Sequence, residues 1–499
     1  MKKLMIVAAL AAVWTAQAKV AFAPVFGDKM VLQRDMPVRV WGTAAPGEAV
    51  KVSFAGQSRE TKACAKGKWM VELGAMSACK EGRTLAANDE VLKDVLVGEV
   101  WFCSGQSNTD CPIWGGSPRY RDGQGAMHIA MTVKPWVRLV KTPLVMDTQP
   151  KLDVKAEWTP MTPQAMEQMA RKPSAMGFFY ALELANALDI PIGLVDSSWG
   201  GTNIDAWTPR SGYEGLKDLD EERDWKVVSQ KDWKAEMRKG PIGGAIQQPS
   251  ALWYGMVAAY APMSIRGFIW YQGCHNAGEY QRYANKMHAL YNGWAKEFKN
   301  PGLKLYFVQL APWGNPGIAY IQEAQAQFDR EEKNAGMAVI NDVGNLADIH
   351  PNDKRTVAKR LALHALKRDY GYSWLNDNSP TLKSWKVEGD KFVLTFNDAK
   401  GWYIYNPDRS VQTGFEVCGD DGKWVKAKIE NLAWGKGRDG KPKCDGNIKG
   451  DGNIKGVDLI VKADGVAAPK KLRYMYSAPW FGCLYNEMNL PLGAFHIGD

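Results

Sequence analysis

Strand and helix patterns alternate between residue 96 and about residue 370, and this alternation constrains the fold of the chain most strongly. Apolar runs of strand length lie at 97–103, 192–196, 265–271, 305–310 and 337–341. Longer runs with helical spacing lie at 176–188, 280–298 and 351–368, the last with Pro351 in its first turn. This order predicts an α/β fold: a three-layer α/β/α domain over residues 96–375 with a mostly parallel sheet.

Short apolar runs separated by turn residues flank this region on both sides. Val50–Phe54 is one such run before it, and Phe392–Phe396 is one after it. They predict β-sandwich-like domains at residues 19–95 and 376–499. A chain of 499 residues is long enough for several domains. A six-residue unit, Asp-Gly-Asn-Ile-Lys-Gly, occurs twice at 445–456 and indicates an expanded loop.

The first 18 residues have the pattern of a signal peptide. Lys2 and Lys3 precede an apolar stretch, and Ala16-Gln-Ala18 is a small-residue cleavage site. The mature chain is therefore expected to begin at Lys19 and to be exported to the periplasm or the medium. The apolar stretch is too short to span a membrane, and no other candidate span is present in the sequence, so we expect no membrane partner.

Charge and cysteine patterns exclude several classes of function. The formal net charge is +9, but the sequence contains no long basic run and no nucleic-acid motif, so no nucleic-acid partner is expected. Eight cysteines are present without a C-x-x-C pair, and neither a metal nor a cofactor is expected. An exported protein can form disulfides, for example Cys64 with Cys79 or Cys418 with Cys444. The sequence leaves the oligomeric state open.

Four polar clusters each follow a predicted strand of the central region. They are Ser104-Gly-Gln-Ser-Asn108, Asp196-Ser-Ser-Trp-Gly-Gly-Thr-Asn203, Trp270-Tyr-Gln-Gly-Cys-His-Asn276 and Asp342-Val-Gly-Asn-Leu-Ala-Asp-Ile-His-Pro351. Ligands of parallel sheets bind beyond the carboxyl ends of the strands, so the clusters predict one shared site. Together they contain a serine, glycine N–H groups, an asparagine amide and an Asp-His pair. Acyl transfer by serine requires these groups.

The clusters also resemble the sequence blocks of a known family. Gly98-Glu-Val-Trp-Phe-Cys-Ser-Gly-Gln-Ser-Asn108 is similar to the first block of sialate O-acetylesterases, which belong to the SGNH (GDSL-like) hydrolases. Gly200-Gly-Thr-Asn-Ile-Asp-Ala-Trp207, Trp270-Tyr-Gln-Gly273 and Asp348-Ile-His-Pro351 look like the later blocks. The resemblance covers nearly the whole mature chain and implies an SGNH-hydrolase-like central domain.

Carried over position by position, the resemblance implies roles for individual residues. Ser107 is the nucleophile, His350 the general base and Asp348 the carboxylate that orients it. Gly201 (or Gly200) and Asn276 are the oxyanion donors, together with the backbone N–H of Ser107. Asp348 lies two residues before His350, whereas the superfamily usually places its acid three before, where this chain has Ala347. A Ser-His dyad and a helix-capping role for Asp348 therefore remain open alternatives.

The implied activity is hydrolysis of O-acetyl esters on sugars through an acyl-serine intermediate, with O-acetylated sialic acid as the first substrate candidate. Acetylated xylan, pectin or another glycan is the alternative substrate, and a non-catalytic sugar-binding protein is the alternative class. Aromatic and amide side chains are suited to sugar contact, and the candidates in the clusters are Gln106, Trp199, Trp270 and Gln272. For Trp270 the alternative is a place in the core.

Two cysteines replace residues of the family pattern. Cys111 follows the first block, where the family often has Trp, and Cys274 stands where the third block usually has Glu. Both lie in loops expected to converge at the same edge of the sheet. A Cys111–Cys274 disulfide beside the site is one hypothesis, and two buried free thiols are the other.

Overall fold

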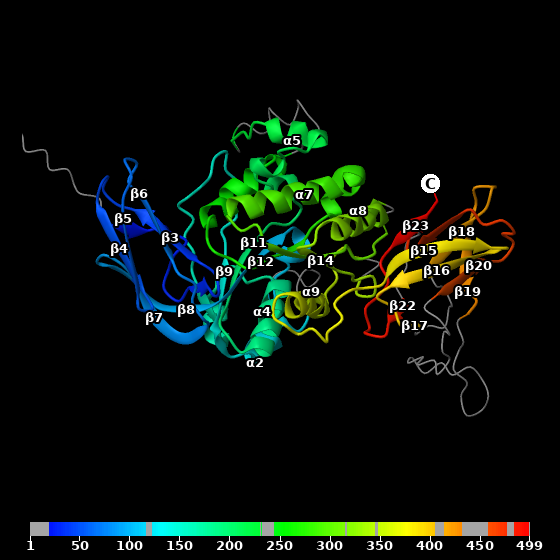
Figure 1. Ribbon diagram of the computed structural model, residues 1–499, viewed down its shortest axis with the longest axis horizontal. Helices are drawn as coiled ribbons and strands as arrows, with labels where there is room; N and C mark the ends of the chain where they lie inside the picture. The colour runs from blue at the N-terminus through cyan, green and yellow to red at the C-terminus, as the bar shows by residue number, and fades with distance from the viewer. Residues whose placement is uncertain are drawn as a thin grey trace, which may run out of the picture.

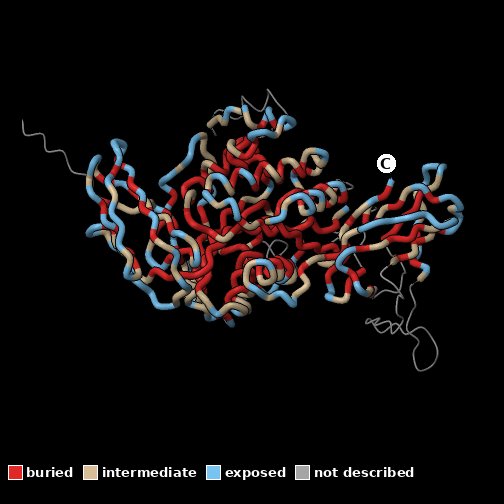
Figure 2. The backbone as a smooth tube through the Cα atoms, in the orientation of Figure 1, coloured by how far each residue is buried: buried red, intermediate tan, exposed pale blue. Residues whose placement is uncertain are grey.

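The computed structural model describes residues 19–115, 122–229, 231, 244–314, 317–344, 348–404, 414–431, 458–476 and 484–498. Figure 1 shows a central body of helices and strands with a β-structure at each end. Buried residues are concentrated in the central body (Figure 2). No helix in the described part of the chain is both long and apolar enough to cross a membrane. The predicted signal peptide and the repeat at 445–456 lie outside the described residues.

The N-terminal strands alternate between buried and exposed residues. In β4 (Ala49–Phe54) the buried side chains are Val50, Val52 and Phe54, the period of two expected of a strand with one face on a core. A three-stranded antiparallel sheet contains β1 (Ala21–Phe22), β3 (Val38–Thr43) and β6 (Lys68–Leu73). A second group contains β4, β5 (Gln57–Lys62), β7 (Cys79–Ala87) and β2 (Val31–Gln33).

Strand β8 (Glu90–Gly105) joins this second group to the central sheet. Its first half pairs with β7 and β2, and its second half pairs with β11 and β12. The predicted boundary between residues 95 and 96 falls inside this strand. Buried Glu99 accepts hydrogen bonds from Arg34 at 2.6 Å and from Arg266 at 3.0 Å, which fixes the middle of β8 to both regions.

The central sheet has the strand order β10-β9-β11-β8-β12-β13-β14. All neighbours from β9 to β14 pair in parallel, and β10 is antiparallel to β9. The strands are β9 (Lys134–Lys141), β10 (Thr159–Met161), β11 (Ile192–Ser198), β12 (Gly267–Tyr271), β13 (Lys304–Val308) and β14 (Ala335–Ala338). Every residue of β11, β12 and β14 is buried, as expected of strands covered on both faces.

Helices cover both faces of this sheet, and the prediction of an α/β fold is confirmed. Figure 1 shows α4 and α9 on one side of the strands and α7 and α8 on the other. The helices of the central region are α1 (Ser107–Asp110), α2 (Gly125–Met131), α3 (Pro163–Gln168), α4 (Ala175–Leu188), α5 (Asp220–Asp224), α7 (Tyr280–Glu297), α8 (Gly317–Glu331) and α9 (Lys354–Arg368). Short 3-10 segments include η1 (Asp205–Trp207) and η7 (Cys274–Glu279).

Helix α9 begins three residues later than the sequence pattern predicts. Its first residue is Lys354 rather than Pro351, because the side chain of Asp353 caps the helix by accepting the backbone N–H of Thr356 at 2.9 Å. Asp348 is therefore not the cap of this helix.

The C-terminal strands form a seven-stranded antiparallel sheet with a core of its own. Its order is β15 (Thr381–Glu388), β16 (Lys391–Asn397), β20 (Leu459–Ala463), β19 (Trp424–Ile429), β18 (Phe415–Cys418), β21 (Lys471–Tyr474) and β23 (Phe495–Ile497). A separate pair contains β17 (Trp402–Ile404) and β22 (Leu484–Asn486). The side chain of Asn341, which follows β14, donates to the carbonyl oxygen of Leu492 at 3.1 Å and so connects this part to the central body.

Candidate active site

Ser107 stands at the carboxyl end of β8, at the first position of the one-turn helix α1. Gly105 ends the strand with a φ of +139°, and a β-carbon there would lie 2.4 Å from the carbonyl oxygen of Tyr271 on β12. Only glycine allows the two strands to lie this close while the chain turns into α1. The turn leaves Ser107 partly exposed.

The structure brings Ser107, His350 and Asp348 into one hydrogen-bonded chain. Ser107 Oγ lies 3.0 Å from His350 Nε2, and His350 Nδ1 lies 3.0 Å from Asp348 Oδ1. The same carboxylate oxygen accepts the backbone N–H of His350 at 2.9 Å. Because an ionised carboxylate only accepts hydrogen bonds, it selects the tautomer with the proton on Nδ1. Nε2 is then able to accept the proton of the Ser107 hydroxyl.

Asn108 and Lys354 hold the loop that carries His350 against α1. Asn108 Nδ2 donates to the carbonyl oxygen of Ile349 at 3.0 Å. Lys354 Nζ donates to Asn108 Oδ1 at 2.8 Å and to the carbonyl oxygen of Pro351. Lys354 is fully buried, and burial lowers its pKa. The sequence offers no signal for this role, because a lysine in the first turn of a helix usually lies in solvent.

Gly201 lies exposed in the loop after β11, with a φ of +73°. Its carbonyl oxygen accepts Gln247 Nε2 at 2.7 Å, which holds this peptide in place. In the same loop, the backbone N–H of Trp199 donates to the carbonyl oxygen of Gly105 at 3.2 Å. The loop is therefore tied to the end of the strand that leads to Ser107. A β-carbon at Gly201 would meet nothing within 4 Å, so the chain is not crowded on that side at this position.

Asn276 is fully buried in η7, which follows β12. Its Oδ1 accepts Gln272 Nε2 at 2.7 Å and the backbone N–H of Ile204 at 3.1 Å. Its Nδ2 donates to Glu279 Oε2 at 2.9 Å. The bond to Ile204 links η7 to the segment that follows Gly201, so the two predicted oxyanion residues belong to one connected unit.

Of the four predicted sugar-contacting residues, only Trp199 keeps a partly exposed side chain. Gln106 is 4% exposed, and its Oε1 accepts the backbone N–H groups of Gly273 at 3.2 Å and His275 at 3.3 Å. It holds η7 against α1 instead of facing solvent.

Trp270 and Gln272 are both 0% exposed, so direct sugar contact does not agree with their positions. Trp270 packs edge-on against Trp207, because β12 is covered on both faces. Gln272 is held at both ends of its amide. Its Nε2 donates to the carbonyl oxygen of Thr202 at 3.1 Å, and its Oε1 accepts the hydroxyl of Tyr283 at 2.8 Å.

The proposed disulfides are not formed in the structure. Cys111 and Cys274 are both free thiols, as are Cys64, Cys79 and Cys418. Burial raises the pKa of the Cys111 thiol and raises that of Cys274 to about 12, so both stay protonated at neutral pH. The hypothesis of a Cys111–Cys274 bond is therefore wrong for this structure, and the alternative of two free thiols holds. Cys444 lies outside the described residues.

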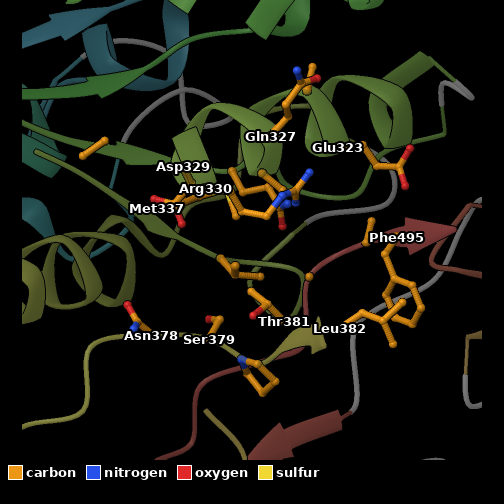
Figure 3. Close-up of a pocket in the computed structure, with 18 of the residues that line it drawn as sticks. Glu323, Gln327, Asp329, Arg330, Met337, Asn378, Ser379, Thr381, Leu382 and Phe495 are labelled. Carbon is orange, nitrogen blue, oxygen red and sulfur yellow. The ribbon is translucent and has the colours of Figure 1, made fainter. Parts of the chain in front are cut away.

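A large cavity lies apart from these residues, between α8 and the C-terminal sheet (Figure 3). Its volume is about 840 Å³, and Glu323, Asp329, Thr381 and Phe495 are among the residues that line it. Neither Ser107 nor His350 is among the described residues that line this cavity. Cavity size alone therefore does not locate the reactive groups.

Comparison with known proteins identifies the family. The family model described as "Carbohydrate esterase, sialic acid-specific acetylesterase" matches residues 97–367, more than half of the chain, and the match includes Ser107, Asn276 and His350. The chain belongs to this carbohydrate esterase family. Its resemblance to the sialate O-acetylesterases is thereby confirmed.

The esterase is similar to named relatives over most of its length. It is 29% identical over 478 residues to the sialate O-acetylesterase of Rattus norvegicus, covering 83% of this chain and 85% of the relative. It is 28% identical over 455 residues to that of Homo sapiens, covering 83% of each. A solved structure of a carbohydrate acetylesterase from Xanthomonas citri matches with a TM-score of 0.78 and 29% identity. That match covers 96% of this chain and 99% of the other.

The pH dependence of the esterase should follow the protonation of His350. Burial disfavours the imidazolium and lowers the pKa of His350 from its ordinary 6.5, although Asp348 opposes this shift. His350 accepts a proton only when it is neutral. We therefore expect kcat/KM to reach its maximum above this pKa and to fall as the pH drops through it. Initial rates with p-nitrophenyl acetate from about pH 5 to about pH 8 should give an acid limb with its midpoint below 6.5. A midpoint above 6.5 would mean that the charge of Asp348 outweighs burial.

Lys354→Met should lower kcat about ten- to hundredfold, because the loop that carries His350 loses its anchor and small displacements of a catalytic base are costly. The Tm should fall modestly, because Asn108 Oδ1 and the Pro351 carbonyl oxygen lose a buried donor, and kcat is therefore measured well below the Tm. Lys359→Met, at an exposed position of the same helix, is the matched control. Equal kcat values for the two variants would show that the anchor does not matter.

Proposed function

We propose that this esterase removes O-acetyl groups from sugars through an acyl-serine intermediate. The observation that carries the proposal is the chain from Ser107 Oγ through His350 to Asp348, with both side-chain distances at 3.0 Å. The names of the similar proteins support acetylated carbohydrate as the substrate class. The parallel strands, with Ser107 following the central strand β8, support the assignment to the SGNH hydrolases.

In the first half-reaction, Ser107 Oγ attacks the carbonyl carbon of the acetyl group while His350 Nε2 takes the hydroxyl proton. The resulting oxyanion accepts hydrogen bonds from the backbone N–H groups of Ser107 and Gly201 and from Asn276 Nδ2. When the tetrahedral intermediate collapses, the sugar oxygen leaves with the proton that His350 returns.

In the second half-reaction, a water molecule attacks the acetyl group on Ser107. His350 takes a proton from this water and returns it to Ser107 Oγ, and acetate leaves. Asp348 keeps Nδ1 protonated throughout and stabilises the imidazolium that forms in each half-reaction.

Acetate release from a panel of substrates tests the proposal. O-acetylated sialic acid is the first candidate, and acetylated xylan and acetylated pectin are the alternatives. Enzyme-dependent release from at least one of them, absent with Ser107→Ala, supports a sugar acetylesterase, and the preferred substrate identifies the sugar. Release from p-nitrophenyl acetate but from no acetylated carbohydrate would contradict the substrate class.

We also propose that the chain is exported, on the strength of the charged, apolar and small-residue pattern of residues 1–18. The mature protein should begin at Lys19 and be found in the periplasm or the medium. N-terminal sequencing of the fractionated protein checks this, and a chain recovered from the cytoplasm with its first residues intact would contradict it.

A further inference from the structure

A network of mostly buried charges contacts Asn276, and the proposed mechanism assigns it no role. Lys286 of α7 is 2% exposed. Its Nζ lies 2.9 Å from Asp205 Oδ2, 3.1 Å from Glu279 Oε2 and 3.2 Å from Glu222 Oε1. Glu222 also pairs with Arg282 at 2.8 Å. Asp205 and Glu222 are buried, whereas the side chain of Glu279 lies at the edge of the network and is 44% exposed.

One oxygen connects this network to the candidate active site. Glu279 Oε2 accepts both Lys286 Nζ at 3.1 Å and Asn276 Nδ2 at 2.9 Å. Within the described part of the chain, neither Asp205 nor Glu222 forms a hydrogen bond with Asn276. Glu279 is thus the member of the network placed to act on the Asn276 amide.

The contacts of Asn276 allow only one orientation of its amide. The backbone N–H of Ile204 can only donate, so the atom facing it must be the oxygen. An ionised Glu279 can only accept, so the atom facing it must be the nitrogen. A rotation of the amide by half a turn would place donor against donor and acceptor against acceptor. One hydrogen of Nδ2 is used by Glu279, and the second has no acceptor among the described residues.

Lys286 keeps Glu279 in the ionised form that this orientation needs. Burial is the largest single influence on Glu279 and opposes its ionisation, but the ammonium of Lys286, the amide of Asn276 and the guanidinium of Arg282 together outweigh it and hold the pKa of Glu279 below its ordinary value. Burial likewise opposes the charge of Lys286, but Asp205, Glu279 and, to a smaller extent, Glu222 together outweigh it and raise the pKa of Lys286. Both groups are therefore charged at neutral pH, and charge-assisted hydrogen bonds are stronger than neutral ones.

We propose that Glu279, held by Lys286, is a positioning residue that aims the free N–H of Asn276 at the oxyanion. The proposal rests on the proposed function, in which Asn276 is an oxyanion donor. The oxyanion exists only in the transition state and the tetrahedral intermediates. A misaimed donor should therefore lower kcat and leave KM nearly unchanged.

The size of the effect follows from two facts. Loss of a whole oxyanion donor costs about 10²- to 10³-fold in kcat. Glu279→Ala keeps the donor and removes only the group that aims it, and water can reach the half-exposed position of Glu279. A loss of about tenfold is therefore expected for Glu279→Ala, and about 10²-fold for Asn276→Ala.

The experiment measures kcat and KM for acetate release by Glu279→Ala, Glu279→Gln, Asn276→Ala and the double variant Glu279→Ala/Asn276→Ala. Glu222→Gln is the matched control, because Glu222 touches the same lysine and not Asn276. Glu279→Ala should lose about tenfold in kcat, with KM within about threefold. Glu279→Gln, which retains an acceptor, should recover most of the loss, and Glu222→Gln should resemble the unaltered protein. The double variant should be no slower than Asn276→Ala, because Glu279 has no donor left to position once the Asn276 amide is removed.

Thermal unfolding checks each variant. Should Glu279→Ala not fold, Glu279→Asp replaces it, because it keeps a charge near Lys286 and withdraws the acceptor from Asn276. An unchanged kcat in a folded Glu279 variant, or additive losses in the double variant, would overturn the positioning role while Ser107 and Asn276 keep theirs. An unchanged kcat in Asn276→Ala would overturn the oxyanion role of Asn276 and the inference with it. Full activity in Ser107→Ala would instead overturn the proposed function.

Discussion

Replacing Ser107 with alanine is expected to lower kcat for acetate release by about four orders of magnitude or more. In the proposed mechanism the covalent route disappears with the hydroxyl, and what remains comes from binding and oxyanion stabilisation alone. Because Ser107 is partly exposed on a one-turn helix, the substitution should not lower the Tm. Acetate release under single-turnover conditions measures the loss directly.

Ser104→Ala is the matched control for this experiment. Ser104 lies three residues before Ser107 and is fully buried, and its Oγ has no hydrogen-bond partner among the described residues. Its replacement should leave kcat within about twofold. A Ser104 variant as inactive as the Ser107 variant would point to damage of β8 and not to loss of a nucleophile.

Asp348→Asn should lower kcat by about 10²- to 10⁴-fold, with the upper limit taken from the corresponding change in a serine protease. An asparagine can present its amide N–H to Nδ1 and so stabilise the tautomer that carries its proton on Nε2, which cannot accept the proton of Ser107. The loss should appear in kcat while the far-UV spectrum and the Tm stay close to those of the unaltered protein.

Asp353→Asn provides the comparison, because Asp353 caps α9 and asparagine is an equally good cap. It should keep full activity. A loss of less than about tenfold for Asp348→Asn would mean that Ser107 and His350 act as a dyad, or that another carboxylate orients the histidine.

The sequence predicts five central strands and the helices α4, α7 and α9 because their signals are local, whereas β9, β10 and α8 are not predicted. Four of the five predicted strands are apolar runs that end at a polar cluster, and parallel strands bring these ends to one edge. Asp348 and His350 are close in sequence, so a turn suffices to place the carboxylate against Nδ1. The continuity of β8 is harder to predict, because a strand that serves two sheets shows no break in its pattern at the boundary.

The functional residues that the sequence does not reveal depend on contacts between segments that lie far apart in the sequence. Lys354 and Lys286 look like ordinary helical lysines, and only the packing of distant segments buries them. Trp270 and Gln272 look suited to sugar contact, but they belong to a strand and a turn that are covered on all sides. Conversely, two cysteines in converging loops do not imply a bond, since bonding depends on the direction of their side chains.

The central claim is that Ser107 forms the covalent intermediate, and active-site labelling tests it most directly. The protein is treated with a serine-directed phosphonate until acetate release stops and is then mapped by peptide mass spectrometry. The proposed mechanism predicts one adduct, on Ser107, that is absent from Ser107→Ala and still forms on Ser104→Ala. An adduct on a different serine, or complete inhibition with Ser107 unmodified, would contradict it.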